Sequence, residues 1–133
     1  MAWMSYGTYE DVDVGALMGQ TLVSAEADED SITFVATNGD TYVMHHQQDC
    51  CEDVSIESIV GDISDLVGAP ITMAEAVSSD DAPPKDPDDA EYGSYTWTFY
   101  KFATVKGYVD VRWYGVSNGY YSESVDFVKL LKN

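Results

Sequence analysis

The stretch SITFVATNGDTYVMHH, residues 31–46, gives the clearest indication of the fold. Apolar and polar side chains alternate on both sides of Asn38-Gly39, as in two half-buried strands. Asn-Gly is a strong hairpin signal, because a type I′ turn needs a positive φ at both central residues. We therefore predict an antiparallel hairpin with a two-residue loop, in which Ile32 and Val43 share a face.

A second hairpin is predicted around Val105-Lys106-Gly107. Large apolar side chains recur at alternate positions before and after this loop: Tyr95, Trp97, Phe99, Val109, Val111 and Trp113. A three-residue loop with Gly107 in the left-handed conformation brings these apolar faces together, whereas a loop of even length pairs apolar with polar side chains. The three-residue loop places Tyr100 opposite Arg112, the only arginine.

Two segments, residues 13–22 and 62–71, follow the same order of residue types. Each begins with an Asp suited to an N-cap, continues for one or two helical turns and reaches a Gly suited to the left-handed conformation before a strand. Together with the hairpins, they predict an α+β fold. It would be mainly an antiparallel sheet built from two hairpins plus flanking strands, with one or two short helices.

The 133 residues are 45% hydrophobic, which is enough for one core. We predict a flexible N-terminal extension over residues 1–13 and a single globular domain over residues 14–133. Residues 78–91 hold three of the four prolines and six acidic residues. This segment is predicted to be a solvated loop or a disordered tether.

Acidic residues dominate the charge, with 24 against six basic residues and a net charge of −18. Residues 1–91 hold 21 of the acids and a single base, Lys85. Direct binding to nucleic acid is not expected, because it depends on clusters of Lys and Arg. A partner protein with a basic surface is favoured. The alternative is that the charge serves only solubility or adaptation to high salt.

The sequence predicts a cytoplasmic protein that does not contact a membrane. It has no run of roughly 18 apolar residues, and its first 13 residues lack the order of a signal peptide. The two cysteines, Cys50 and Cys51, are adjacent, and neighbours bridge only through a strained ring. Neither is expected to have an intrachain partner, and free thiols suit a reducing cytosol. The sequence indicates no oligomeric state.

The string HHQQDCCE, residues 45–52, gathers imidazole, thiol and carboxylate groups where a strand is predicted to end. These groups are ligands of zinc and iron, so a metal-binding module is the alternative function. The spacing matches no established zinc module, and roles in capping and packing are the other interpretation. The metal candidates are His45, His46, Asp49, Cys50 and Glu52.

Catalysis is not predicted, and no cofactor is expected apart from the alternative of zinc. A thiolate of Cys50 or Cys51 could pair with a histidine base, but Asp49, Glu52 and Asp53 surround the thiols, and negative charge raises a thiol pKa. The sequence also lacks a Gly-rich phosphate loop, a nucleophile elbow and an HExxH string.

The string RWYGVSNGYYSES, residues 112–124, is a second candidate region, because Tyr, Trp and Arg are enriched in binding hot spots. The alternative is a turn whose aromatic residues pack on a sheet. We expect Arg112 to form a bidentate pair with one carboxylate of Asp49, Glu52 or Glu123. The candidate binding residues of both strings are His46, Asp49, Cys50, Cys51, Glu52, Arg112, Tyr114, Asn118, Tyr120, Tyr121 and Glu123.

Four strings in this order carry a resemblance over residues 17–127: QDCCE from Gln48, GDISDLVGAPI from Gly61, YTWTFYK from Tyr95 and RWYGVSNGYYSESV from Arg112. The chain resembles a small family of unknown function encoded mainly by tailed bacteriophages. The resemblance implies a phage genome and the cytoplasm of an infected bacterium. Small phage proteins of this kind often bind and inhibit a host or defence protein. We therefore expect an acidic accessory protein that binds a macromolecular partner through a nucleic-acid-like surface.

Overall fold

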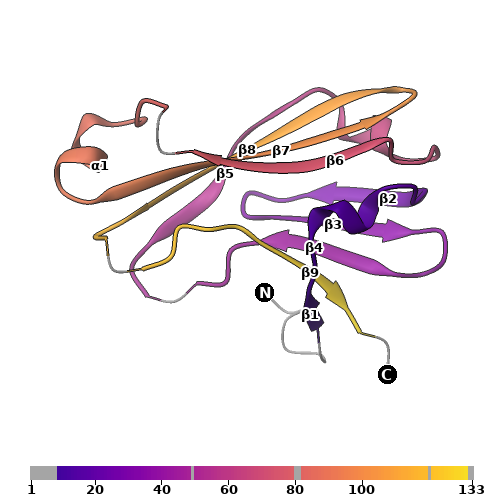
Figure 1. The fold of residues 1–133 in the computed structure, drawn as a ribbon, viewed down its shortest axis with the longest axis horizontal. Helices are drawn as coiled ribbons and strands as arrows, with labels where there is room; N and C mark the ends of the chain where they lie inside the picture. Colours follow the sequence, from indigo (N-terminus) through magenta and orange to yellow (C-terminus); the bar gives the residue numbers. More distant parts are fainter. Residues whose placement is uncertain (1–8, 49, 80–81, 120, 132–133) are drawn as a thin grey trace.

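The computed structural model describes residues 9–48, 50–79, 82–119 and 121–131. Over these residues the chain forms two antiparallel sheets that stack face to face (Figure 1). The first sheet has the order β1 (Tyr9–Asp11), β9 (Asp126–Leu130), β4 (Thr41–His45), β3 (Ser31–Ala36) and β2 (Leu22–Ala27). The second has the order β5 (Asp53–Val60), β8 (Gly107–Ser117), β7 (Ser94–Thr104) and β6 (Met73–Ser79).

Helices contribute little to this architecture. Within the described ranges, the single α-helix is α1 (Pro87–Glu91), and two 3₁₀ turns cover Val14–Leu17 and Ile63–Leu66. The prediction of mainly antiparallel pairing with hairpins is confirmed, but the structure has no clear α component. The two hairpins also lie in different sheets, because each sheet covers the apolar face of the other.

The first hairpin exists, but its predicted register is wrong. Ile32 lies opposite Met44, and Phe34 lies opposite Tyr42. The loop therefore has three residues between Ala36 and Asp40, and of these only Gly39 has a positive φ, at 91°. This loop needs a positive φ at one position, which a Gly occupies, whereas a type I′ turn needs it at two. Tyr42 and Met44, instead of Val43 and His45, share the core face with Ile32.

The second hairpin has a loop one residue shorter than predicted, whereas the loop of the first is one residue longer. Thr104 pairs with Gly107, so the loop is Val105-Lys106, and Gly107 does not have a positive φ. Tyr100 consequently lies opposite Val111, and Arg112 lies opposite Phe99. The core face of β7 carries Thr98, Tyr100, Phe102 and Thr104, whereas Tyr95, Trp97 and Phe99 point outward.

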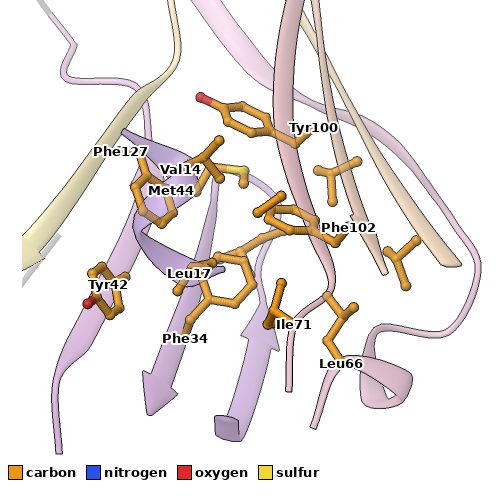
Figure 2. Packing of buried hydrophobic residues seen from close by; sticks show 14 of the residues in the cluster. Val14, Leu17, Phe34, Tyr42, Met44, Leu66, Ile71, Tyr100, Phe102 and Phe127 are labelled. Carbon is orange, nitrogen blue, oxygen red and sulfur yellow. The ribbon is translucent and has the colours of Figure 1, made fainter. Parts of the chain in front are cut away.

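One core cluster fills the space between the sheets. The Phe34 and Phe102 rings come from opposite sheets, with their centroids 5.6 Å apart (Figure 2). Trp113 is completely buried, and its Nε1 donates a hydrogen bond to the Met44 Sδ across the sandwich at 3.0 Å. An indole buried in this way needs such an acceptor, and the sulfur provides one without a charge.

The two similar segments are helical turns that end at a left-handed Gly, as predicted, with φ of 78° at Gly19 and 89° at Gly68. They also bond to each other: the Gly19 N–H donates to the Ile71 carbonyl at 2.9 Å, and the Gly68 N–H donates to the Leu22 carbonyl at 3.0 Å. This approximately two-fold arrangement joins the β2 edge of one sheet to the segment that leads into β6 of the other.

The described part of the acidic segment is not a tether. Residues 82–91, which we call the strap, contact the outer face of the second sheet and end in α1 (Figure 1). The Tyr95 hydroxyl donates to the Ala82 carbonyl at 2.6 Å, and the Trp97 Nε1 donates to the Pro83 carbonyl at 3.0 Å. The acidic sequence of the strap gives no sign of these hydrogen bonds, because the donors are aromatic side chains of the sheet and the acceptors are backbone carbonyls.

The N-terminal end of the chain joins the first sheet from Tyr9. The strand β1 pairs with β9, and Tyr9 lies opposite Leu130. The predicted boundary of the extension at residue 13 is thus too late, because residues 9–11 form a sheet edge. The remaining part of the predicted extension, residues 1–8, lies outside the described residues. No helix in the described part of the chain is long and apolar enough to cross a membrane.

Candidate functional site

The two candidate strings meet at one end of the sandwich. Residues 46–52 lead from β4 in the first sheet to β5 in the second, and residues 118–125 lead from β8 back to β9 (Figure 1). The His46 Nδ1 lies 2.7 Å from the Ser124 carbonyl oxygen, which joins the two connections directly. Two regions 78 residues apart in sequence therefore build one polar site.

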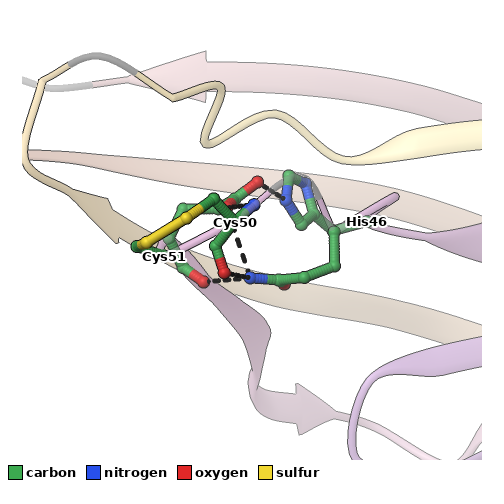
Figure 3. The surroundings of a disulfide bond; sticks show 5 residues. His46, Cys50 and Cys51 are labelled. Carbon is green, nitrogen blue, oxygen red and sulfur yellow. Dashed lines mark hydrogen bonds and ion pairs between the residues drawn. A yellow bond between two sulfur atoms is a disulfide. The ribbon is translucent and has the colours of Figure 1, made fainter.

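His46 and Glu52 form the centre of this site. The His46 Nε2 lies 2.8 Å from the Glu52 Oε2, and the two side chains are only 4% and 0% exposed. The other carboxylate oxygen, Oε1, accepts from the Cys50 backbone N–H at 2.8 Å and from the Gln48 side-chain amide at 3.2 Å (Figure 3). The described residues His46, Gln48 and Cys50 thus all bond to one buried carboxylate.

The hydrogen-bond partners determine where the protons lie. The Ser124 carbonyl only accepts, so the His46 Nδ1 carries a hydrogen. A second proton must then lie between the His46 Nε2 and the Glu52 Oε2, since neither atom could donate without it. The two further donors at Glu52 favour its carboxylate form, with which a protonated His46 would form a buried ion pair.

A second buried carboxylate, Glu123, fastens the returning connection. The Thr96 hydroxyl donates to its Oε1 at 2.8 Å, and the Ser117 hydroxyl donates to its Oε2. Gly115 allows this close approach, because a Cβ there would lie 2.9 Å from the Glu123 carbonyl oxygen and 3.0 Å from the Glu123 Cβ. The string around Arg112 therefore contributes a structural acid to the site.

Cys50 and Cys51 differ from the sequence-based expectation of two free thiols. Their Sγ atoms form a disulfide bond at the surface beside His46 (Figure 3). The backbone around them is held by Gln48, whose amide also donates to the Cys50 carbonyl, and by Glu52. The described cysteines are thus both bonded to sulfur and offer no thiolate.

The five metal candidates do not come together as far as the described residues show. No group of three His, Cys, Asp or Glu side chains among those residues could hold an ion. His45 lies on the opposite face of β4 from the core, and both nitrogens of His46 have partners. Asp49 lies outside the described residues. Zinc or iron binding stays a prediction, and metal analysis of protein purified without chelator would test it.

His45 makes the stability depend on pH. Burial lowers its pKa from 6.5, opposed by the carboxylates of Asp126 and Asp11. Below the unfolded pKa of about 6.5, the unfolded chain takes up a proton that the folded chain resists, so the free energy of unfolding falls. We expect His45→Gln to lose less stability than the wild type between about pH 7.5 and about pH 5. Equal slopes in urea titrations would contradict a buried neutral His45.

Arg112 does not form the predicted bidentate pair with Glu52 or Glu123. Those carboxylates bind His46 and the two hydroxyls, respectively, and Arg112 is exposed on the outer face. Among the described carboxylates, none forms an ion pair with Arg112. Asp49, the third predicted partner, and Tyr120 lie outside the described residues. Asn118 is exposed and Tyr121 half-buried near the end of the site.

Tyr114 lies beneath the strap. Its hydroxyl donates to the Asp89 Oδ2 at 2.6 Å and accepts from the Lys85 backbone N–H at 3.1 Å. Burial, and after it the hydrogen bond to Asp89, raises the pKa of Tyr114 to about 12. The hydroxyl is therefore a donor throughout the ordinary pH range, and it holds both ends of the segment from Lys85 to Asp89.

Tyr114→Phe is expected to loosen the strap. The loss of the hydroxyl leaves the Lys85 N–H and the Asp89 carboxylate without this partner, at a cost of about 1–2 kcal/mol in the free energy of unfolding. Limited proteolysis should cut within residues 82–91 faster than in the wild type. Tyr92→Phe is the control, because Tyr92 is 75% exposed. The same cleavage rate for both variants would show that Tyr114 does not hold the strap.

Sequence reasoning missed four residues of the site: Gln48, Thr96, Ser117 and Ser124. Ser124 acts through its backbone carbonyl, so its side chain gives no signal. Thr96 and Ser117 are ordinary strand residues whose hydroxyls become important only because Glu123 is folded against them. For Gln48 the sequence did offer a signal: it lies close to the cysteines, and its side-chain amide is a donor of the kind that a buried carboxylate needs.

Fold and site together define a small antiparallel β-sandwich with a buried polar cluster that ties its two sheet connections at one end. The chain belongs to the family described as Domain of unknown function (DUF7448), whose profile matches residues 15–127. This confirms the predicted membership in a small family of unknown function. Searches of curated proteins and of solved structures found no match.

Proposed function

We propose that the protein is a phage-encoded accessory protein that binds a host or anti-phage defence protein with a basic surface. It would act by binding, not by catalysis, and would inhibit its partner by presenting an acidic, nucleic-acid-like surface. The observation that carries the proposal is a band of exposed carboxylates along one edge of the second sheet. The resemblance to phage-encoded proteins supplies the biological setting.

The acidic band follows the edge strand β5 and consists of Glu29, Asp53, Glu57, Asp86 and Asp88. At one end, Asp53 and Asp86 line the same surface groove, which has a volume of about 310 Å³. At the other end, the Ile56 N–H donates to the Glu29 carbonyl at 3.1 Å, which holds the acidic β2–β3 turn beside β5. Three separate parts of the sequence therefore place exposed carboxylates on or beside the β5 edge.

One lysine, Lys85, lines the same groove as Asp53 and Asp86 and partly offsets their charge. Lys85 is the single base in the first 91 residues, and its Nζ lies 5.7 Å from the centre of the Tyr114 ring. Among the described residues, the one Lys–carboxylate salt bridge joins Lys129 to Asp40 at 3.5 Å, on the other sheet. Concentrated negative charge of this kind attracts basic surfaces and speeds their association. Charged residues on an edge strand also prevent aggregation, which is the alternative role.

Two variants of equal charge separate a specific band from bulk acidity. The band variant carries Asp53→Asn, Glu57→Gln and Asp88→Asn, and the control variant carries Glu10→Gln, Asp13→Asn and Glu75→Gln. All six side chains are exposed, and each variant is less acidic by three charges. Immobilised wild type and variants would be incubated with bacterial lysate at about 0.05 M and about 0.15 M salt.

We expect the wild type and the control to retain the same basic protein at the higher salt concentration, and the band variant to lose it. Retention by all three proteins would contradict the acidic band as the contact surface. Equal loss from both variants would show that only bulk charge matters, which is the solubility alternative. Circular dichroism of each variant confirms that the fold is intact.

A further inference from the structure

The outer face of the second sheet carries a row of aromatic side chains that does not belong to the core. Tyr95, Trp97 and Phe99 follow one another along β7, and Tyr114 stands beside them on β8. The Trp97 and Phe99 rings are stacked with centroids 5.9 Å apart, and the Trp97 and Tyr114 centroids are 4.6 Å apart. Such a row is a flat apolar platform with hydroxyl and indole donors along it.

The strap occupies one half of this row. Ala82 and Pro83 each precede a proline, which restricts them to extended or polyproline II conformations. The row binds the strap through the strap's backbone carbonyls. The Tyr95 hydroxyl donates to the Ala82 carbonyl, and the Trp97 Nε1 donates to the Pro83 carbonyl. Aromatic grooves recognise proline-rich segments of other proteins in the same way, since the chain is already extended before it binds. The platform therefore has the chemistry of a proline-binding groove.

The other half of the row is open. A groove of about 330 Å³ continues past the strap and is lined by Ala82, Pro83, Trp97, Phe99 and Arg112. Its lining is mainly apolar except at Arg112, the single arginine of the chain. The guanidinium is exposed and forms no ion pair with any carboxylate that the structure describes. As far as the described residues show, a carboxylate from another chain could pair with this arginine.

We propose that the open groove binds an extended, proline-containing segment of a partner protein, with a carboxylate of that segment paired to Arg112. The aromatic rings and the wall formed by Pro83 would accept proline rings, next to the half of the row that already binds the Ala82 and Pro83 carbonyls. The planar guanidinium binds the carboxylate in a bidentate manner and sets the direction of the segment. The groove goes beyond the proposed function, because it lies on the outer face of the sheet and selects a partner segment of the opposite charge. Its arginine nevertheless lies close to the acidic band, since Arg112 pairs with Ser58 of β5, next to Glu57.

Synthetic peptides test the groove without knowledge of the partner. The ligand is acetyl-Ala-Pro-Pro-Leu-Pro-Asp-Asp-amide; one control has Lys in place of both Asp residues, and another has Ala in place of every Pro. Binding is followed by the ¹H–¹⁵N indole signals of the full-length protein. The Trp97 signal should move with the acidic proline peptide, while the signal of the buried Trp113 stays in place. Each control peptide should bind at least about tenfold more weakly.

Substitutions on the outer face locate the contact. Arg112→Gln and Phe99→Ala should each weaken the binding of the acidic proline peptide by at least about tenfold. Lys101→Gln, a cation on the same face of β7 that does not line the groove, should leave it unchanged. The proposal is wrong if the Trp97 signal does not move at millimolar peptide, if the Lys peptide binds as well, or if binding survives Arg112→Gln. Unchanged spectra elsewhere verify that the variants are folded.

Discussion

Glu52→Ala is expected to lower the free energy of unfolding by about 3–5 kcal/mol, because it leaves the buried His46 Nε2 without its carboxylate partner, as in a broken buried ion pair. The Glu52 carboxylate lies 2.8 Å from the His46 Nε2, and both side chains are almost completely inaccessible. The substitution also removes the acceptor of the Cys50 N–H and of the Gln48 amide. Urea unfolding followed by circular dichroism measures the loss.

The matched control is Glu57→Ala, on the strand that directly follows Glu52 but exposed to solvent, which should change stability by no more than about 0.5 kcal/mol. The double variant His46→Ala/Glu52→Ala gives the interaction energy of the pair. Because the first substitution already breaks the pair, the double variant should lose clearly less than the sum of the single losses. Additive losses, or a loss below about 1 kcal/mol for Glu52→Ala, would contradict a buried ion pair at this site.

Phe102→Ala is expected to lower the free energy of unfolding by about 3–5 kcal/mol through the cavity it leaves between the sheets. Phe102 is fully buried, and its ring packs against that of Phe34 from the opposite sheet (Figure 2). The two sheets meet at this contact. The strands around the missing ring can therefore fill the cavity only if one sheet moves toward the other. Thermal and urea unfolding of the variant measure the loss.

Phe99→Ala is the matched control, because it removes the same ring from the same strand. Phe99 points to the outer face and is only half-buried, so we expect a loss of about 1 kcal/mol. The pair of variants also tests the register of the hairpin. In the register with a three-residue loop, Phe99 faces the core and Phe102 faces solvent, and the two losses would be reversed.

The order of the losses therefore distinguishes two hairpins that differ by a single residue in the loop. The sequence pattern favoured the wrong loop because β7 carries aromatic residues on both faces. The outward face is apolar to hold the strap and to line the groove beside Arg112. Alternation alone cannot tell a core face from an outer face when both carry aromatic residues.

Local chemistry did determine several features. The Asn38-Gly39 turn produced a hairpin, and the segments after Asp13 and Asp62 produced helical turns that end at Gly19 and Gly68. These features depend on the conformational preferences of a few neighbouring residues, which act in the same way in any context. The antiparallel class of the fold follows from the hairpins, and the resemblance over most of the chain identified a family of unknown function.

The tertiary structure alone decided the remainder. It placed the hairpins in separate sheets, chose their registers by burying Phe34 against Phe102, and brought His46 to the carbonyl of Ser124. It also folded the strap onto Trp97 and directed Glu52 toward His46 instead of Arg112. Each of these contacts joins residues whose attraction depends on burial and distance, and neither quantity exists until the two sheets have closed on each other.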